Sequence, residues 1–225
     1  MVESLREQGH PLLTEEELLH LETVGQVLHR DEGHTFFREG EETDFALLIK
    51  KGHIKVVLGK RPRIVAVRGP GETVGEMAAV RPQPRTASAI AIDAVEVLRL
   101  PANAWLRFLY DNPRAMHAQL VAADTRVSQA TNKIVESDLA VEQKLAKALL
   151  ELVEKGVGRE TEDGIAMPLS QQDLASLTGA SLDSVKKIVR TFKEDGMIAT
   201  GRQVVYVREV AAVAEIAEGN RTAAL

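Results

Sequence analysis

The spacing of apolar residues changes along this chain and divides it into stretches of different structure. From about residue 34 to residue 100, short apolar runs such as residues 54–58 alternate with polar residues and are separated by glycine and proline. This pattern predicts an all-β sandwich or barrel of short strands. Ahead of it, Thr14 and Glu17 form a capping-box pattern among leucines at helical spacing, so one or two short helices are expected to precede the first strand.

The period changes after Asn112 and Pro113. Apolar residues there recur at alternating steps of four and three for nearly three heptads, which is typical of a two-stranded coiled coil. The alternative is an amphipathic helix lying on its own domain, but such a helix usually has a wider apolar stripe. We therefore expect a homodimer. Its dimer interface is predicted to contain Met116, Leu120, Ala123, Val127, Ala130 and Ile134.

Two further signals follow this helix. Asp138 is suited to cap a second helix, which carries leucines between residues 139 and 152, and the break before it is a candidate hinge. Gly156, Gly158 and Gly164 then predict a loop.

The C-terminal part of the chain carries two capped helices separated by a glycine. Ser170 and Asp173 form a capping-box pattern, Gly179 marks a turn, and Ser181 is suited to cap the second helix. Residues 197–207 then have the pattern of a β-hairpin. A helix, a short turn and a helix are typical of a helix-turn-helix, and a helical hairpin with only a structural role is the alternative. The β-hairpin that follows favours a winged helix-turn-helix domain.

The solvent side of the second of these helices is suited to DNA. A groove-reading helix contacts base edges near its N-terminus, and flanking polar and basic residues contact phosphates. Lys187 is suited to guanine and Asp183 to cytosine. We assign base-edge contact to Leu182, Asp183, Lys186 and Lys187, and backbone positioning to Ser170, Gln171, Ser181, Ser184 and Arg190. A twofold dimer implies a pseudo-palindromic site in double-stranded DNA, with half-sites about one helical turn apart.

The candidate ligand chemistry lies between Gly75 and Ala89, where the chain reads GEMAAVRPQPRTASA. Gly75 permits a strained entry into a short helical turn whose first backbone N–H groups form an anion site. Arg85 adds a planar donor fork matched to phosphate, whereas Glu76 can accept hydrogen bonds from sugar hydroxyls. Small apolar residues around these charges favour a pocket over a solvated surface arginine, so the predicted ligand is a phosphorylated sugar.

The motif GEMA followed by PRTASA resembles the phosphate-binding cassette of cyclic-nucleotide-binding domains. From about Leu12 to Val207, the chain is similar to the cyclic-AMP receptor and fumarate-nitrate regulator family of bacterial transcription regulators. This resemblance implies an α+β protein with an N-terminal, jelly-roll-like β-roll that binds cyclic nucleotide at residues 1–112. A dimerisation helix at 113–137 and a winged helix-turn-helix DNA-binding domain at 138–225 are expected to follow. It also implies RNA polymerase as a partner.

The resemblance assigns roles to particular residues. The family's glycine and following amides hold the cyclic phosphate, its glutamate binds the ribose hydroxyl, and its arginine binds the phosphate charge. Beside the seam, Thr131 and Asn132 resemble a polar pair that contacts the purine and comes partly from each subunit, although exposed helix positions are the alternative. The ligand-binding residues expected here are Gly75, Glu76, Met77, Ala78, Arg85, Thr86, Thr131 and Asn132.

The identity of the ligand and of the operator stays open at this point. Cyclic AMP is the expected effector, and Thr86 is compatible with cyclic AMP or cyclic GMP. The best-known family members carry Arg-Glu at the positions of Leu182 and Asp183 and arginine at Lys187, so their operator is not assumed here. A regulator that is ligand-independent, or that senses another small anion, is the main alternative. A nucleotide-binding subunit acting through protein contacts would not need the basic second helix or the wing.

Composition excludes several other functions. The chain has 225 residues, no cysteine and a net charge of −5. It therefore has no disulfide and no cysteine-ligated iron–sulfur cluster, and it is not a strongly basic nucleic-acid coat. Its six histidines lack metal-ligand spacing, so we expect no metal and no enzyme activity; a haem ligand role for His117 is the less favoured alternative. Without an apolar run of membrane-spanning length or a signal-peptide core, the protein is expected to be cytoplasmic and to bind no membrane.

Overall fold

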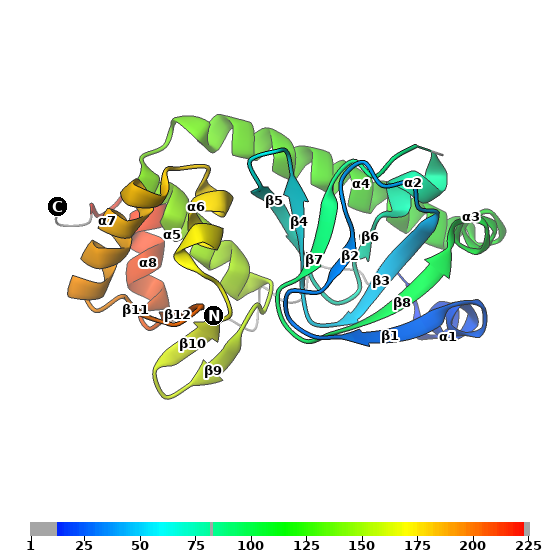
Figure 1. Ribbon diagram of the computed structural model, residues 1–225, viewed down its shortest axis with the longest axis horizontal. Coiled ribbons are helices and arrows are strands. Elements are labelled where there is room, and N and C mark those ends of the chain that lie inside the picture. The colour runs from blue at the N-terminus through cyan, green and yellow to red at the C-terminus, as the bar shows by residue number, and fades with distance from the viewer. Residues whose placement is uncertain (1–12, 82, 223–225) are drawn as a thin grey trace. The chain divides into compact units, whose positions relative to one another are not determined.

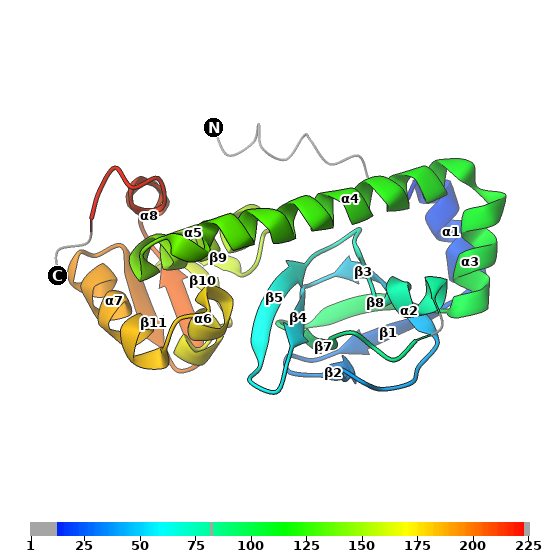
Figure 2. The same ribbon diagram turned by 90° about the horizontal axis from the view of Figure 1, so that it is seen from above.

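The computed structural model describes residues 13–81 and 83–222 (Figures 1 and 2). Residues 1–12 of the predicted first domain, Pro82 and residues 223–225 of the tail lie outside the described residues. The chain forms two compact units. The first holds the described residues up to 56 together with 68–135, and the second holds 57–67 and the described residues from 136 onwards. No described helix is long and apolar enough to cross a bilayer.

The first unit is a β-roll of two four-stranded sheets, with strand orders β1-β8-β3-β6 and β2-β7-β4-β5. Strands β4 and β5 cross the boundary between the two units. Side chains between the sheets fill the core, among them Leu47, Ile49 and Val97, each 0% exposed. The predicted fold class, including the sandwich of short strands, is confirmed. The strands are β1 (Gln26–Arg30), β2 (Thr35–Phe37), β3 (Phe45–Lys51), β4 (Ile54–Leu58), β5 (Arg63–Arg68), β6 (Thr73–Val74), β7 (Ser88–Ala91) and β8 (Val95–Pro101).

Four helices accompany the β-roll. They are α1 (Glu15–Val24), α2 (Glu76–Val80), α3 (Ala102–Asp111) and α4 (Pro113–Val135). The predicted capping box of Thr14 and Glu17 opens α1. Pro113 occupies the first position of α4, where its missing N–H costs no helical hydrogen bond. In Figure 2, α4 runs along the β-roll.

Helix α3 is absent from the sequence-based prediction. It begins directly after Pro101, and no side-chain hydrogen bond caps its N-terminus, so it lacks the usual start signal. Its buried residues Trp105, Phe108 and Leu109 pack in one core cluster with strands β3 and β8. Their spacing of three and four residues is the helical signal that was available.

The second unit contains the predicted helix-turn-helix and wing. Its elements are a 3₁₀ helix (Glu136–Asp138), α5 (Val141–Glu154), β9 (Arg159–Thr161), β10 (Gly164–Met167), α6 (Gln171–Thr178), α7 (Leu182–Glu194), β11 (Ile198–Gly201), β12 (Val204–Val207) and α8 (Val210–Ala217). Its sheet has the order β11-β12-β10-β9. Ser170 and Asp173 form the predicted capping box, Gly179 adopts a left-handed conformation, and Ser181 caps α7. These local predictions are confirmed.

Two local predictions in this unit are wrong. Asp138 does not cap α5, because that helix begins three residues later and its N-cap, Ala140, makes no side-chain hydrogen bond. The stretch from Gly156 to Gly164 is not only a loop, because β9 pairs with β10 there. The three residues of β9 are all exposed, so they provide no alternation of buried and exposed positions from which a strand is predicted.

Candidate ligand cassette and DNA-reading helix

Gly75 begins the cassette at a position that only glycine fits well. Its φ of 78° lies in the left-handed region, directly before α2. A Cβ atom there would lie 2.5 Å from Arg85 Nη1 and 2.9 Å from the ring of Phe37. Both the backbone conformation and the close approach of the arginine therefore require glycine.

Arg85 is the central charge of the cassette. Its side chain is almost fully enclosed, because the residue is 3% exposed. The guanidinium donates hydrogen bonds of 2.6 Å to Thr43 Oγ1, to the Gly75 carbonyl and to the Phe45 carbonyl. Its carbon also lies 4.0 Å from the centroid of the Phe37 ring. The side chain is thus held on several sides before any ligand is considered.

The backbone of Arg85 is fixed as well. Its amide donates to the Glu41 carbonyl at 2.9 Å, and its own carbonyl accepts from the Gly40 amide at 2.8 Å. Residues 38–41 form a turn in which the Arg38 amide donates to a Glu41 side-chain oxygen. The turn that follows β2 therefore positions the cassette arginine.

The charge of Arg85 is not neutralised by a direct ion pair with any described residue. All three of its hydrogen-bond acceptors are uncharged oxygens. Burial lowers the pKa of Arg85 below its ordinary value, and the carboxylate of Glu76, which lies farther away, partly opposes this effect. A buried cation without an adjacent anion is costly, so the site favours an anionic ligand.

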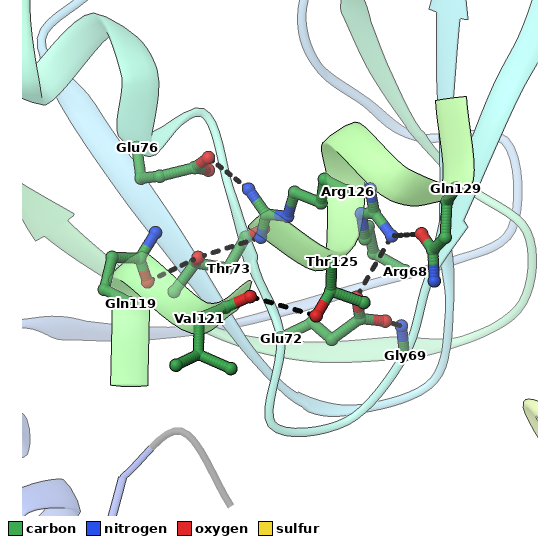
Figure 3. A network of polar contacts seen from close by, with 10 residues as sticks. All are labelled: Arg68, Gly69, Glu72, Thr73, Glu76, Gln119, Val121, Thr125, Arg126 and Gln129. Atoms are coloured by element: carbon green, nitrogen blue, oxygen red, sulfur yellow. Dashed lines mark hydrogen bonds and ion pairs between the residues drawn. The ribbon is translucent and has the colours of Figure 1, made fainter. Parts of the chain in front are cut away.

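Glu76 is held by a residue from α4. The carboxylate accepts from Arg126 Nη1, and Arg126 Nη2 donates to the Thr73 carbonyl at 2.8 Å (Figure 3). The Thr73 hydroxyl in turn donates to Gln119 Oε1 at 3.3 Å. Glu76 is only 7% exposed, so its orientation is set by this contact. A carboxylate has several acceptor positions, and those not used by Arg126 can accept from a sugar hydroxyl.

A second polar contact joins α4 to the end of β5. Arg68 Nη1 donates to Glu72 Oε1 at 3.2 Å and to Gln129 Oε1 at 3.3 Å (Figure 3). Glu72 also accepts from the Gly69 amide at 2.8 Å. Burial lowers the pKa of Arg68; Glu72 opposes this decrease, and the positive charge of Arg126 adds to it.

The structure brings only some of the predicted ligand residues together. Gly75, Glu76 and Arg85 meet in the cassette. In contrast, Thr86 is exposed, and Met77 is 56% exposed with Ala78 half-buried beside it. The roles of these three in ligand binding stay predictions.

Thr131 and Asn132 lie on the exposed side of α4. The Thr131 hydroxyl donates to the Val127 carbonyl of its own helix at 3.0 Å. Their predicted contact with the base depends on a second copy of the chain and stays a prediction. Among the described residues, the α4 side chains with hydrogen bonds to the cassette or to the strands beside it are instead Gln119, Arg126 and Gln129.

Sequence reasoning missed Arg68, Arg126 and Gln129. Arg126 and Gln129 lie away from the apolar seam, and with Gln119 and Ala122 they continue a four-three spacing of their own. This second stripe was the available signal, but a helix pattern alone does not reveal which surface the stripe meets. Arg68 is the last residue of β5 and carries no sequence signal that distinguishes it from a surface arginine.

The predicted dimer seam forms the outward face of α4. Met116, Leu120, Val127 and Ile134 are 38%, 67%, 65% and 72% exposed, and Ala123 and Ala130 are exposed as well. Ala115, by contrast, faces the β-roll core and is 0% exposed. One helix therefore carries a buried side, a polar side that contacts the cassette, and an exposed apolar side.

Helix α7 presents the predicted DNA contacts to solvent. Lys186, Lys187 and Arg190 are exposed, whereas Val185 and Phe192 are 0% exposed in the core of the unit. Arg190 Nε pairs with Glu194 at 2.8 Å. Of the other predicted base-edge residues, Asp183 is exposed and Leu182 is half-buried.

The serines assigned to backbone positioning already take part in helix capping. Ser181 Oγ accepts from the Ser184 amide at 3.1 Å and lies 2.8 Å from Ser184 Oγ. Ser170 Oγ donates to Asp173 at 2.6 Å, and Gln171 beside it is half-buried. Their contacts with DNA phosphates stay predictions. No group of three or more potential metal ligands occurs among the residues that the structure describes.

Comparison with known families and proteins matches both units. Residues 27–112 match the family model of the cyclic nucleotide-binding domain, and residues 143–216 match that of the Crp-like helix-turn-helix domain. The chain is 31% identical to the cyclic AMP receptor protein of Thermus thermophilus over 218 residues, covering 93% of this chain and 96% of that protein.

Two further comparisons agree with these matches. The chain is 30% identical over 176 residues to the CRP-like cAMP-activated global transcriptional regulator of Mycobacterium tuberculosis, covering 74% of this chain and 76% of that protein. The c-di-GMP responsive global regulator CLP of Xanthomonas campestris has the same fold. Its structure aligns with a TM-score of 0.74 at 18% identity, covering 86% of this chain and 99% of that one.

Proposed function

Because this chain belongs to the cyclic AMP receptor and fumarate-nitrate regulator family of transcription regulators, we propose that a cyclic nucleotide controls its binding to DNA. The nucleotide binds at the cassette around Arg85, and cyclic AMP is the first candidate because relatives are named for it. The active species is a homodimer that reads a pseudo-palindromic operator with its two copies of α7. RNA polymerase is the expected partner of the DNA-bound dimer.

The observation that carries this proposal is the state of Arg85. A guanidinium that is 3% exposed, and whose hydrogen-bond acceptors are all uncharged, is held where the charge of a cyclic phosphate would compensate it. Glu76 supplies the separate acceptor that a ribose hydroxyl needs. An inorganic anion would use the arginine but not the glutamate.

The dimer and the DNA contacts are supported by surface chemistry. The apolar seam of α4 exposes large side chains at Leu120, Val127 and Ile134 in a row, and such a row is suited to a second copy of the same helix. Lys186 and Lys187 extend into solvent from the helix that matches the Crp-like domain. Ligand binding then controls DNA binding only through different affinities for the two arrangements of the dimer.

The cassette is tested by calorimetric titration with cyclic AMP and with cyclic GMP, using the wild type and Arg85→Met. We expect saturable binding by the wild type and a loss of about a hundredfold or more in the variant, because a charge-assisted contact in a buried site is removed. Arg81→Met is the matched control, since Arg81 is an exposed arginine of the same stretch, and its affinity is expected to stay unchanged.

Three results would contradict the proposal. Binding of neither nucleotide would leave a DNA-binding regulator that is ligand-independent or that senses another anion. Equal affinities of the wild type and Arg85→Met would place the nucleotide elsewhere. If Arg85→Met and Arg81→Met lost the same amount of nucleotide affinity, the effect would come from the overall charge of the protein and not from a specific contact in the cassette.

A further inference from the structure

Arg68 is a buried arginine whose hydrogen-bonding capacity is largely unused. The residue is 8% exposed and ends β5. Both of its hydrogen bonds come from Nη1, to Glu72 at 3.2 Å and to Gln129 at 3.3 Å, and both are longer than the usual 2.9–3.0 Å. No described residue accepts a hydrogen bond from its Nε or Nη2.

These free donors keep contact with solvent. Among the described residues, the one fully enclosed side-chain nitrogen or oxygen without a hydrogen-bond partner is Trp105 Nε1. Nε and Nη2 of Arg68 are therefore not sealed in the protein. A side chain that is mostly buried but keeps accessible donors is suited to receive acceptors from a ligand.

The hydrogen bonds around Arg68 indicate at which end of the cassette its Nε and Nη2 donors lie. Arg85 lies at the predicted phosphate and Glu76 at the predicted ribose. Arg126 binds Glu76, and Gln129, three residues along α4 from Arg126, contacts Arg68 (Figure 3). In a cyclic nucleotide the phosphate and the base are attached to opposite sides of the ribose, so a group beyond Glu76 faces the base.

We propose that Arg68 reads the edge of the base and makes the cassette selective for a 6-oxopurine cyclic nucleotide, such as cyclic GMP. Guanine presents two acceptors, O6 and N7, that match the fork of an arginine, whereas adenine presents N7 beside an N6 amino donor. An arginine has no acceptor for that amino group. Glu72 already neutralises Arg68, so an uncharged acceptor edge suits the site better than a second phosphate does. This inference rests on the proposed function, because it concerns the same cassette. It replaces cyclic AMP, which was the first candidate only because relatives are named for it, by a 6-oxopurine nucleotide.

The test is a set of titrations with cyclic GMP, cyclic IMP and cyclic AMP, using the wild type, Arg68→Met and Arg68→Lys. Arg68→Met is expected to lower the affinity for cyclic GMP and for cyclic IMP by about tenfold or more. Its affinity for cyclic AMP is expected to fall by less than about threefold. Cyclic IMP shares O6 and N7 with cyclic GMP but lacks its amino group, so the two are expected to lose affinity together. Arg68→Lys keeps the charge beside Glu72 but loses the fork, and it is expected to lose most of the preference.

Several outcomes would overturn the inference. A uniform loss for all three nucleotides in Arg68→Met would assign Arg68 a purely structural role. A loss confined to cyclic GMP would place the contact at its amino group, which an arginine cannot bind. If Arg68→Lys kept the full preference for cyclic GMP and cyclic IMP over cyclic AMP, the paired guanidinium donors of Arg68 would not be the source of that preference.

Failure of the inference is distinguishable from failure of the proposed function. If the wild type binds no cyclic nucleotide, both fail; if it binds with a selectivity that does not depend on Arg68, only the inference fails. The fluorescence of Trp105, the chain's single tryptophan and 0% exposed in the first unit, reports whether each variant is folded. If Arg68→Met does not fold, the contrast between Arg68→Lys and the wild type decides. Arg81→Met is the matched control, expected to bind each nucleotide as the wild type does.

Discussion

The cassette and the DNA-reading helix are both proposed to bind phosphate-containing ligands, but the chain prepares them in opposite ways. Arg85 is buried, hydrogen-bonded on each nitrogen and stacked on Phe37. Lys186 and Lys187 of α7 are exposed and form no ion pair with another described residue. A preorganised site loses little freedom on binding a small ligand, whereas the solvated lysines must be ordered when they reach base edges in the DNA groove.

Nucleotide binding and operator binding are therefore expected to depend to different degrees on a second copy of the chain. The charged residues of the cassette come from one chain, and the polar pair Thr131 and Asn132, predicted to come partly from each subunit, is uncharged. A palindromic operator, however, needs two copies of α7. Dimer disruption is therefore expected to separate the two activities.

The largest expected effect comes from placing a charge in the apolar seam of α4. Val127→Glu is expected to convert the dimer to a monomer, because a carboxylate would be buried against a second copy. Operator affinity should fall by about a hundredfold or more, since the two half-sites no longer act together. Nucleotide affinity should fall by less than about tenfold. Analytical ultracentrifugation, DNA anisotropy and calorimetry measure the three quantities.

Ser128→Glu is the matched control, since Ser128 is exposed on α4 and lies beside the seam rather than in it. It should remain dimeric and bind operator normally. A dimeric Val127→Glu protein with unchanged operator affinity would show that this seam is not the interface.

A smaller effect is expected from removing single charges on α7. Lys187→Gln should weaken operator binding by about 1–3 kcal/mol and relax the preference at one base pair. Arg190→Gln should weaken binding to all DNA sequences similarly. The slope of log K against the logarithm of the salt concentration should become smaller in magnitude by about one. Anisotropy titrations at several salt concentrations, on operators with single substitutions, distinguish the two. If Lys187→Gln weakened all sequences equally, its assigned base contact would be wrong.

The smallest effect is expected from the helix cap. Ser181→Ala should cost about 1 kcal/mol of stability in the second unit, because the Ser184 amide loses its acceptor. Hydrogen exchange should accelerate in α7 and stay unchanged around Trp105 in the first unit. Equal acceleration in both units would contradict the expectation that the cap acts locally.

Local signals along the sequence predicted much of the fold. The capping boxes at Thr14 and Ser170, the turn glycines and the alternation of the strands each depend on neighbouring residues, and the structure contains them. Helix α3 was missed because it follows Pro101 without a polar cap. Asp138 was misassigned because a capping residue type occurs three residues before the helix that it was expected to cap.

The candidate site was predictable only in part, for a physical reason. Gly75, Glu76 and Arg85 lie close together in the sequence, so the motif itself identifies them. Arg126 is 50 residues from Glu76, and Gln129 is 61 residues from Arg68. Such pairs form only when α4 packs on the β-roll, and no local pattern specifies which face of a helix is covered.

Occupancy of the cassette is proposed to control DNA binding. The most direct measurement is the affinity of the dimer for an operator selected from random DNA, with and without saturating nucleotide, for the wild type and Arg85→Met. We predict a change of about fivefold or more in the wild type and no change in the variant. Equal operator affinity of the wild type with and without bound nucleotide would show that the cassette does not control DNA binding.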